Sequence, residues 1–354
     1  MTRTEILTWL REEEQEVLDR LYKQADTARQ KHVADAVHLR GLIEISNHCV
    51  RRCAYCGINR TRHAVQRYRM TADGIVEASR LAREFGYGTV VLQAGEDYGL
   101  TTAFVSDVIR RIKQESDLAV TLSLGERPRT DLEAFRAAGA DRYLLRFETS
   151  DPELYARIHP ALDSRPSNRF SDLRALRELG YEVGSGVMVG IPGQTYETLA
   201  RDIEMFHELD LDMVGVGPYI PHPNTPLGRG EHPDAPAGKQ VPQDLEMTFK
   251  TLALTRILCP RANLPTTTAV TTVNAGAGRR HGLERGANVI MPNLTPLEYR
   301  ALYEIYPAKA GILERPRESD RLVKELLRTL GRPVGNGPGG CRRPARNDDS
   351  SQAA

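Results

Sequence analysis

This 354-residue sequence has almost no excess of charge of one sign, no long apolar run and few cysteines that could pair. Lys and Arg number 48 against 47 Asp and Glu, so the positive surface of a sequence-independent nucleic-acid binder is missing. No apolar run approaches about 18 residues, and the N-terminus is acidic and amphipathic, which predicts neither a membrane span nor a signal peptide. We therefore expect a cytoplasmic protein with no nucleic-acid or membrane partner.

Cysteine occurs five times, at Cys49, Cys53, Cys56, Cys259 and Cys341. The odd count, with three thiols inside eight residues, argues against a disulfide framework and favours a metal site. Cys259 lies in an apolar helical segment, which is typical of a core position, and Cys341 lies in a polar C-terminal stretch.

Short apolar segments alternate with amphipathic ones between residues 39 and 330. Strands are expected at 42–46, 89–93, 119–124, 143–148, 182–189, 213–217, 263–267 and 287–291. Helices are expected between them, including 71–86, 101–115, 130–138, 168–179 and 195–209. This alternation predicts an α/β fold, a (β/α)8 barrel of the TIM type, with a doubly wound sheet of fewer strands as the alternative. Residues 1–38 are expected to form N-terminal helices, and the Gly- and Pro-rich residues 331–354 a disordered tail.

Polar side chains share one face of several predicted strands. Around strand 143–148, Arg142, Arg146 and Glu148 alternate with apolar residues, and Gln93 and Ser123 lie on comparable faces. The apolar face must meet the helices, so the polar face points into the barrel. Buried charge is costly unless it is paired or liganded, so we expect a polar, partly anionic ligand inside. An internal ion pair with Glu148 is the alternative.

Three cysteines follow the first predicted strand with the spacing Cys49-x3-Cys53-x2-Cys56. Active sites of such barrels form at the carboxyl ends of the strands. Three thiolates can bind three irons of a [4Fe–4S] cluster and leave the fourth iron open. A zinc site that recruits His48, or three incidental thiols, are the alternatives.

This spacing, with Tyr55 at the aromatic position, resembles the signature of the radical S-adenosylmethionine (SAM) superfamily. The segments LQAGED, LLRFETSDPELYARIHP, GVMVGIPGQT and GANVIMPNLTP add a resemblance to the HydE family, radical SAM maturases of [FeFe]-hydrogenase, over about residues 40 to 315. The resemblance implies one [4Fe–4S] cluster on the three cysteines and SAM as cofactor. It implies that reduction of the cluster cleaves SAM to a 5′-deoxyadenosyl radical.

The resemblance also implies the residues that contact each ligand. SAM contacts are implied at Tyr55, Gln93, Gly95, Glu96, Ser123, Glu148, Arg169, Gly190, Ile191 and Pro192. Substrate contacts are implied at Arg142, Arg146, Thr266, Thr267, Thr268, Met291, Tyr303 and Tyr306. Taken without the resemblance, Arg169 is more typical of a solvated helix residue, Met291 of the core, and Gly190 of a plain strand-to-helix turn.

For the family, the implied substrate is a small iron complex that carries cysteine, CO and cyanide, with other hydrogenase maturases and an external electron donor as partners. Methylornithine synthase and biotin synthase resemble this sequence more distantly. One alternative function is therefore an amino-acid carbon-skeleton mutase like methylornithine synthase, and another is a non-catalytic iron–sulfur carrier. Many HydE proteins have a second cysteine cluster, but the matching segment GILERPRESDRLVKELL has no cysteine. We therefore expect a single cluster. Phe147 replaces a His of some members and should face the helices.

Overall fold

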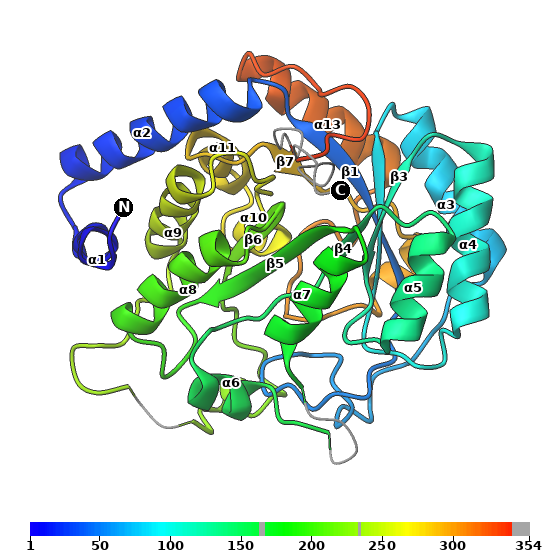
Figure 1. The fold of residues 1–354 in the computed structure, drawn as a ribbon, viewed down its shortest axis with the longest axis horizontal. Helices are drawn as coiled ribbons and strands as arrows, with labels where there is room; N and C mark the ends of the chain where they lie inside the picture. The colour runs from blue at the N-terminus through cyan, green and yellow to red at the C-terminus, as the bar shows by residue number, and fades with distance from the viewer. Residues whose placement is uncertain (163–166, 233–234, 342–354) are drawn as a thin grey trace, which may run out of the picture.

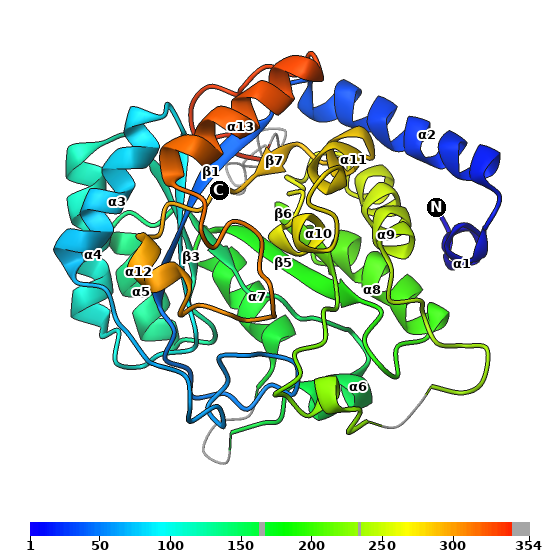
Figure 2. The ribbon, with the colours of Figure 1, turned by 180° about the vertical axis from the view of Figure 1, so that it is seen from behind.

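The computed structural model describes residues 1–162, 167–232 and 235–341. A parallel sheet forms its centre, with seven strands among the described residues in the order β6-β5-β4-β3-β2-β1-β7. The sheet curls into a half-barrel (Figures 1 and 2). Its strands are β1 His38–Ser46, β2 Thr89–Ala94, β3 Ala119–Ser123, β4 Arg142–Leu144, β5 Glu182–Val189, β6 Met213–Pro218 and β7 Val289–Ile290.

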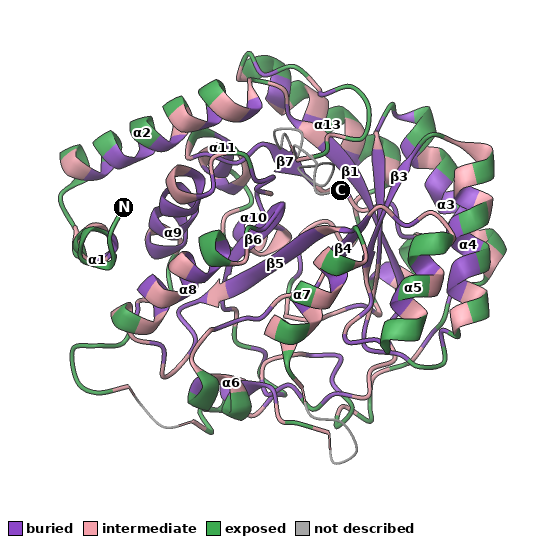
Figure 3. Ribbon diagram, viewed as in Figure 1, coloured by how far each residue is buried: buried purple, intermediate pink, exposed green. Residues whose placement is uncertain are grey.

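Helices surround the sheet on its outer side, and the residues between helices and sheet form the apolar core (Figure 3). The five helices predicted between strands all form, as α3 Ala72–Glu84, α4 Thr102–Glu115, α5 Arg129–Ala137, α7 Arg169–Glu178 and α8 Tyr196–Glu208. Thr71, Thr101, Asn168 and Thr195 cap four of them by accepting a hydrogen bond from a first-turn backbone N–H. Phe147 faces these helices and packs on Phe170 and Phe206, as predicted.

The remaining helices lie before β1, in the connections between strands and after β7. Two of them, α1 Arg3–Arg11 and α2 Gln15–Val33, precede β1 and pack against α8 and α9. The others are α6 Pro152–Ile158, η1 Leu227–Arg229, α9 Leu245–Leu258, α10 Thr268–Val273, α11 Gly278–Glu284, α12 Leu297–Arg300 and α13 Pro316–Thr329. In the described ranges, none of the helices has the length and apolar character needed to cross a membrane.

The eight strands of the predicted barrel are not all present. The expected strand 263–267 makes only isolated bridges, Asn263 to Met213 of β6 and Pro265 to Val289 of β7. Pro265 has no N–H to donate, which prevents a continuous ladder at this position. This segment therefore lies between β6 and β7 without forming a strand, and the expected strand 287–291 shortens to two residues.

The predicted disordered tail is wrong for its first residues, because 334–341 form a closing segment at the amino ends of the strands. Val334 bridges Val37, and the Gly335 N–H donates to the Val37 carbonyl at 2.8 Å. The segment approaches so closely that a Cβ at Gly88 would lie 1.7 Å from the Gly337 oxygen. In the sequence, this segment is rich in Gly and Pro and has no apolar pattern, so nothing in it indicated an ordered structure. Residues 342–354 of the predicted tail lie outside the described residues.

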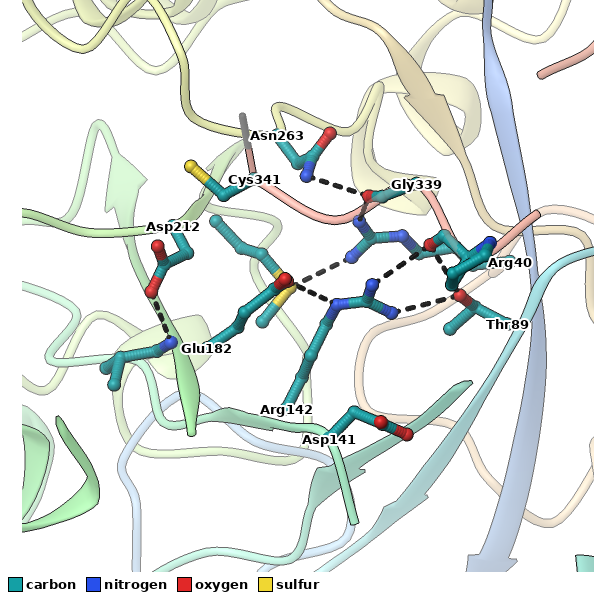
Figure 4. Close-up of polar contacts among 12 residues, drawn as sticks. Arg40, Thr89, Asp141, Arg142, Glu182, Asp212, Asn263, Gly339 and Cys341 are labelled. Carbon is teal, nitrogen blue, oxygen red and sulfur yellow. Dashed lines mark hydrogen bonds and ion pairs between the residues drawn. The ribbon is translucent and has the colours of Figure 1, made fainter. Parts of the chain in front are cut away.

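Side chains from four parts of the barrel hold the closing segment (Figure 4). The Pro338 carbonyl accepts from Thr89 Oγ1 and Arg142 Nη2, both at 3.0 Å. The Gly339 carbonyl accepts from Arg40 Nη2 and Asn263 Nδ2, both at 3.1 Å. The segment therefore supplies the acceptors that these buried donors need.

Truncation after Pro333 should destabilise the protein, because it removes the acceptors of four buried donors and the backbone hydrogen bond of Gly335. At about 1 kcal/mol for each hydrogen bond, the loss is about 5 kcal/mol, or roughly 10 °C in melting temperature. A truncation of residues 342–354 alone is the matched control, because it retains every one of these contacts. Equal melting temperatures of the two truncated proteins would show that the closing segment contributes no stability.

Candidate active site

A cavity of about 320 Å3 lies inside the curled sheet. At the carboxyl ends of the strands its wall includes Cys49, Cys56 and Gly95, and at the amino ends it includes Arg40. Residues two apart on a strand share a face, so β1 presents Arg40, Leu42 and Glu44 to the same space. The cavity therefore extends along the strands from the cysteine loop toward the closing segment.

Most of the predicted site residues meet at this cavity. Its lining includes Cys49, Tyr55, Cys56, Gln93, Gly95, Ser123, Arg146, Glu148, Thr267, Thr268, Met291, Tyr303 and Tyr306. These residues come from the ends of β2 and β3, from the segments that follow β1, β2 and β4, and from the C-terminal third of the chain. The structure does not place Cys53, Glu96, Arg142, Arg169, Gly190, Ile191, Pro192 or Thr266 in its lining.

The loop that carries the three cysteines follows β1 and is held by the buried Asn47 and the half-buried Arg67. Arg67 donates to the Ile58 and Asn59 carbonyls, both at 2.7 Å, and Asn47 Nδ2 donates to the Leu302 carbonyl at 2.8 Å. Gly95 is required beneath the loop, because a Cβ there would lie 2.2 Å from the His48 oxygen and 2.9 Å from the Cys49 Cβ. The backbone around the thiols is therefore fixed before any ligand binds.

The chemistry of the three thiols fits a cluster. Burial raises the pKa of Cys49, Cys53 and Cys56, that of Cys56 to about 12, and repulsion among them raises the pKa of Cys53 and Cys56 further. Three thiolates this close need positive charge, which iron ions supply, and binding would release their protons. The zinc alternative needs four converging ligands. Among the described residues, no three His, Cys, Asp or Glu side chains are arranged around a single-ion position.

A buried ionic network supports the cysteine loop from behind. Arg51, which lies between Cys49 and Cys53, forms ion pairs with Glu96 at 2.8 Å and Glu126 at 2.6 Å. Arg169 joins the same network through Glu126 at 3.1 Å, with its side chain only 10% exposed. The interpretation of Arg169 as a solvated helix residue is therefore wrong. In this structure Glu96 and Arg169 both contact Glu126, and neither lines the cavity. Their SAM contacts remain a prediction.

The turn at Gly190, Ile191 and Pro192 also lies outside the cavity wall. Ile191 is fully buried in a small apolar cluster against which Tyr55 and Met188, both in the cavity wall, are packed. Gly190 has a φ of +81° and would place a Cβ 2.5 Å from the Gln243 Cα, so this turn requires glycine. The SAM contacts implied for this turn therefore remain a prediction.

The two arginines predicted to form an anion pocket are both neutralised by carboxylates. Arg142 pairs with Glu182 at 2.5 Å at the amino ends of the strands and stays outside the cavity. Arg146 pairs with Glu148 at 2.9 Å, so the internal ion pair considered as the alternative does form, but with Arg146 alone. Arg142 is displaced because β4 begins with it, at the end of the barrel opposite the cysteines.

Glu148 is held in a backbone conformation that is unusual for a residue with a side chain. Its φ is +61°, in the left-handed region, and Glu148 makes only an isolated bridge, to Val187, four residues beyond the end of β4. The Glu148 N–H still donates to the Gly186 carbonyl at 3.0 Å, which keeps it beside β5. Strain of this kind costs about 1–3 kcal/mol and is concentrated at ligand-binding positions.

Sequence reasoning missed a second buried ion pair in the cavity wall, between Glu44 and Lys309. Glu44 also accepts from Asn293 Nδ2 at 3.1 Å, and Lys309 lies 5.0 Å from the centre of the Tyr303 ring. The alternation along β1 could have identified Glu44 as inward-facing. Lys309 lies in an irregular segment, where side chains do not alternate or repeat at a helical spacing, so the sequence could not indicate that it faces the cavity.

Comparison with known proteins agrees with this geometry. The family model of the radical SAM superfamily matches residues 43–206, which include the cysteine loop and Glu148. The [FeFe] hydrogenase maturase subunit HydE of Thermotoga maritima is 47% identical over 323 residues, covering 91% of this chain and 89% of that protein. The chain belongs to the HydE family. It is a radical SAM enzyme, and the family implies a [4Fe–4S] cluster and SAM.

More distant relatives of this HydE-family chain share its fold. The 3-methylornithine synthase of Methanosarcina acetivorans is 27% identical, covering 89% of this chain and 85% of that protein. The crystal structure of methylornithine synthase superposes with a TM-score of 0.79 at 25% identity and covers 95% of this chain and 94% of that one. The maturase HydG superposes with a TM-score of 0.75 at 18% identity, over 93% of this chain and 72% of that one.

We expect one cluster in this HydE-family chain, with roughly four iron and four sulfide ions bound by Cys49, Cys53 and Cys56. Cys53→Ala should abolish cluster assembly, because it removes one of three thiolate ligands. The double variant C259S/C341S is the matched control and should retain all the iron. Iron and sulfide analysis checks both, and a content near eight irons in the unmodified protein would contradict a single cluster.

Glu148→Gln should weaken SAM binding by about 10- to 100-fold, since it removes a charged acceptor worth about 1.5–3 kcal/mol. Cluster content should not change. The melting temperature should fall only slightly, because the Arg146 side chain is 29% exposed and can be solvated. Titration with SAM and thermal melting of one preparation check this. A large loss of stability with unchanged SAM affinity would mean that the pair is only structural.

Proposed function

We propose that this chain acts in maturation of an [FeFe]-hydrogenase, as a radical SAM enzyme that modifies a small iron complex carrying cysteine, CO and cyanide on the way to the H-cluster. The observation that carries the proposal is the 47% identity to a HydE maturase over 91% of the chain. A polar cavity that begins at the cysteines is consistent with it.

In this proposal the cluster and SAM bind at the cysteine end of the cavity, and the substrate binds deeper inside. Cys49, Cys53 and Cys56 would hold the cluster, and Glu148 and Gly95 lie beside them to bind and orient the amino-acid part of SAM. When bound, the cluster supplies the electron that splits SAM into methionine and a 5′-deoxyadenosyl radical. An external reductant would have to deliver that electron.

The substrate would lie farther along the cavity, against Arg146, Thr267 and Tyr303. Hydroxyl and guanidinium groups donate hydrogen bonds to anionic ligands such as cyanide and carboxylate. The enclosing walls keep water away from a reactive radical, and the fixed loop backbone holds both reactants in place. Delivery of the complex by another maturase is part of the proposal.

The test has two arms, one with the reconstituted, reduced protein and one with the gene in a host. In the first, incubation with SAM should yield 5′-deoxyadenosine, and Cys53→Ala should yield none. In the second, the gene should restore active [FeFe]-hydrogenase to a host that has every other maturase but lacks its own HydE, and Cys259→Ser should do so equally well. SAM cleavage without hydrogenase activation, together with formation of 3-methylornithine, would favour the mutase instead.

A further inference from the structure

Glu148 forms the tip of a tight turn in the cavity wall. The Thr149 N–H donates to the Phe147 carbonyl at 2.7 Å, so this hydrogen bond encloses Glu148 alone, whose φ is +61°. A three-residue turn with a positive φ at its centre is the rare and strained kind of γ-turn. Such a conformation persists only where the surrounding structure holds it in place. The contacts of the residues after Glu148 therefore decide whether its side chain stays directed at the cavity.

One buried carboxylate holds these residues. Asp202 lies on α8, the helix that packs against β5 on the outer side of the sheet (Figure 1), and it is fully buried. Its Oδ1 accepts a hydrogen bond from the Ser150 N–H at 2.5 Å and another from the Thr149 hydroxyl at 3.5 Å. The two residues that follow Glu148 are therefore both tied to Asp202.

The other oxygen of Asp202 contacts a second segment of the cavity wall. Its Oδ2 accepts from Gln194 Nε2 at 3.3 Å, and the same Nε2 donates to the Met188 carbonyl at 3.1 Å. The amide of Gln194 is fixed in this orientation, because its Oε1 accepts from the Gly190 N–H at 2.8 Å. Asp202 thus joins the segment of Glu148 to the segment of Met188, and both of these residues line the cavity.

Asp202 itself does not line the cavity, and these three contacts of its carboxylate are with neutral donors. A buried carboxylate is costly, so an apolar residue of similar size would suit a position that only fills space. A carboxylate has two acceptor oxygens and no donor, which matches three donors that converge from two segments. These contacts are those of a residue that fixes the position of the wall from outside.

We propose that Asp202 is a positioning residue for SAM binding, which holds the strained turn so that the Glu148 carboxylate faces the cavity before SAM binds. This inference rests on the proposed function, in which Glu148 binds the amino-acid part of SAM. The ammonium group of SAM then meets an acceptor that is already in place, and binding does not include the cost of ordering the turn. Without Asp202 the turn relaxes and the Glu148 side chain moves.

The test measures SAM affinity by titration of the full-length protein with its cluster, without reductant, so that SAM is not cleaved. Asp202→Leu has a similar volume and removes every acceptor, so it should weaken SAM binding at least tenfold. Asp202→Asn keeps one oxygen for the Ser150 N–H and should bind SAM within threefold of the unmodified protein. Iron and sulfide analysis should give the same cluster content for all three proteins.

A double-mutant cycle separates positioning from a general loss of stability. If Asp202 acts through Glu148, then Asp202→Leu should weaken SAM binding less than threefold in a protein that already contains Glu148→Gln. The compound 5′-deoxyadenosine lacks the amino-acid part of SAM, so it should bind to Asp202→Leu and to the unmodified protein with affinities within twofold.

Asp212→Leu is the matched control. Asp212 is also fully buried and accepts from a backbone N–H, that of Val183 at 2.7 Å, but it lies at the amino ends of the strands. The control should therefore bind SAM within twofold of the unmodified protein, even where its melting temperature falls.

Thr149→Val has nearly the same shape as the unmodified protein and keeps the test valid if Asp202→Leu does not fold. It removes one of the two donors to Asp202 Oδ1 and should weaken SAM binding about threefold. Unchanged SAM affinity in the folded variants, or a tenfold loss that is additive with Glu148→Gln, would overturn this inference alone. Failure of the unmodified protein to bind SAM would overturn the proposed function and this inference with it.

Discussion

Charged side chains enclosed by a barrel need partners of opposite charge or hydrogen-bond acceptors, and the arrangement of this molecule depends on that constraint. The pair of Lys309 with Glu44 joins the C-terminal region to β1, and the pair of Arg142 with Glu182 joins the neighbouring strands β4 and β5. The pair of Arg146 with Glu148 lies within one segment. A buried ion pair contributes little net stability, but loss of one partner leaves an uncompensated charge and is strongly destabilising. The pair of Lys309 with Glu44 therefore does more to hold the C-terminal region against β1 at the cavity wall than to strengthen the fold.

The same constraint explains why the cysteine loop can be rigid without a ligand. Arg51 places a positive charge between Cys49 and Cys53, and Glu96 and Glu126 hold it from two neighbouring strand ends. Arg169 adds a second cation, so two carboxylates and two guanidinium groups balance each other behind the loop. The loop is thus anchored through charge on one side, and through Asn47 and Arg67 on the other. Three thiols remain on the free side, where an iron–sulfur cluster would complete the charge balance.

Much of the fold and of the candidate site could be predicted from side chains that recur at helical or strand spacing. The helices between the strands and the inward faces of β2 to β4 follow from the spacing of apolar residues. The features that could not be predicted lie in irregular segments. Lys309 lies outside any helix or strand, so no spacing of apolar residues indicates where its side chain points, and residues 334–341 have the composition of a disordered tail. The segment 263–267 has the apolar pattern of a strand, but Pro265 cannot complete the ladder. The partners of Arg142 and Arg169 were missed because ion pairs join residues through space, which a single sequence does not record.

The closing segment shows why Arg40 and Arg142 differ although they lie side by side. Both donate to backbone carbonyls of this segment, Arg142 to Pro338 and Arg40 to Gly339. A carbonyl satisfies an N–H donor and orients the guanidinium, but it does not cancel a full charge. Arg142 also has the carboxylate of Glu182, whereas Arg40 has a thioether in the equivalent place. The closing segment therefore fixes the positions of both guanidinium groups, while Glu182 forms its ion pair with Arg142 and attracts Arg40 only from a longer distance.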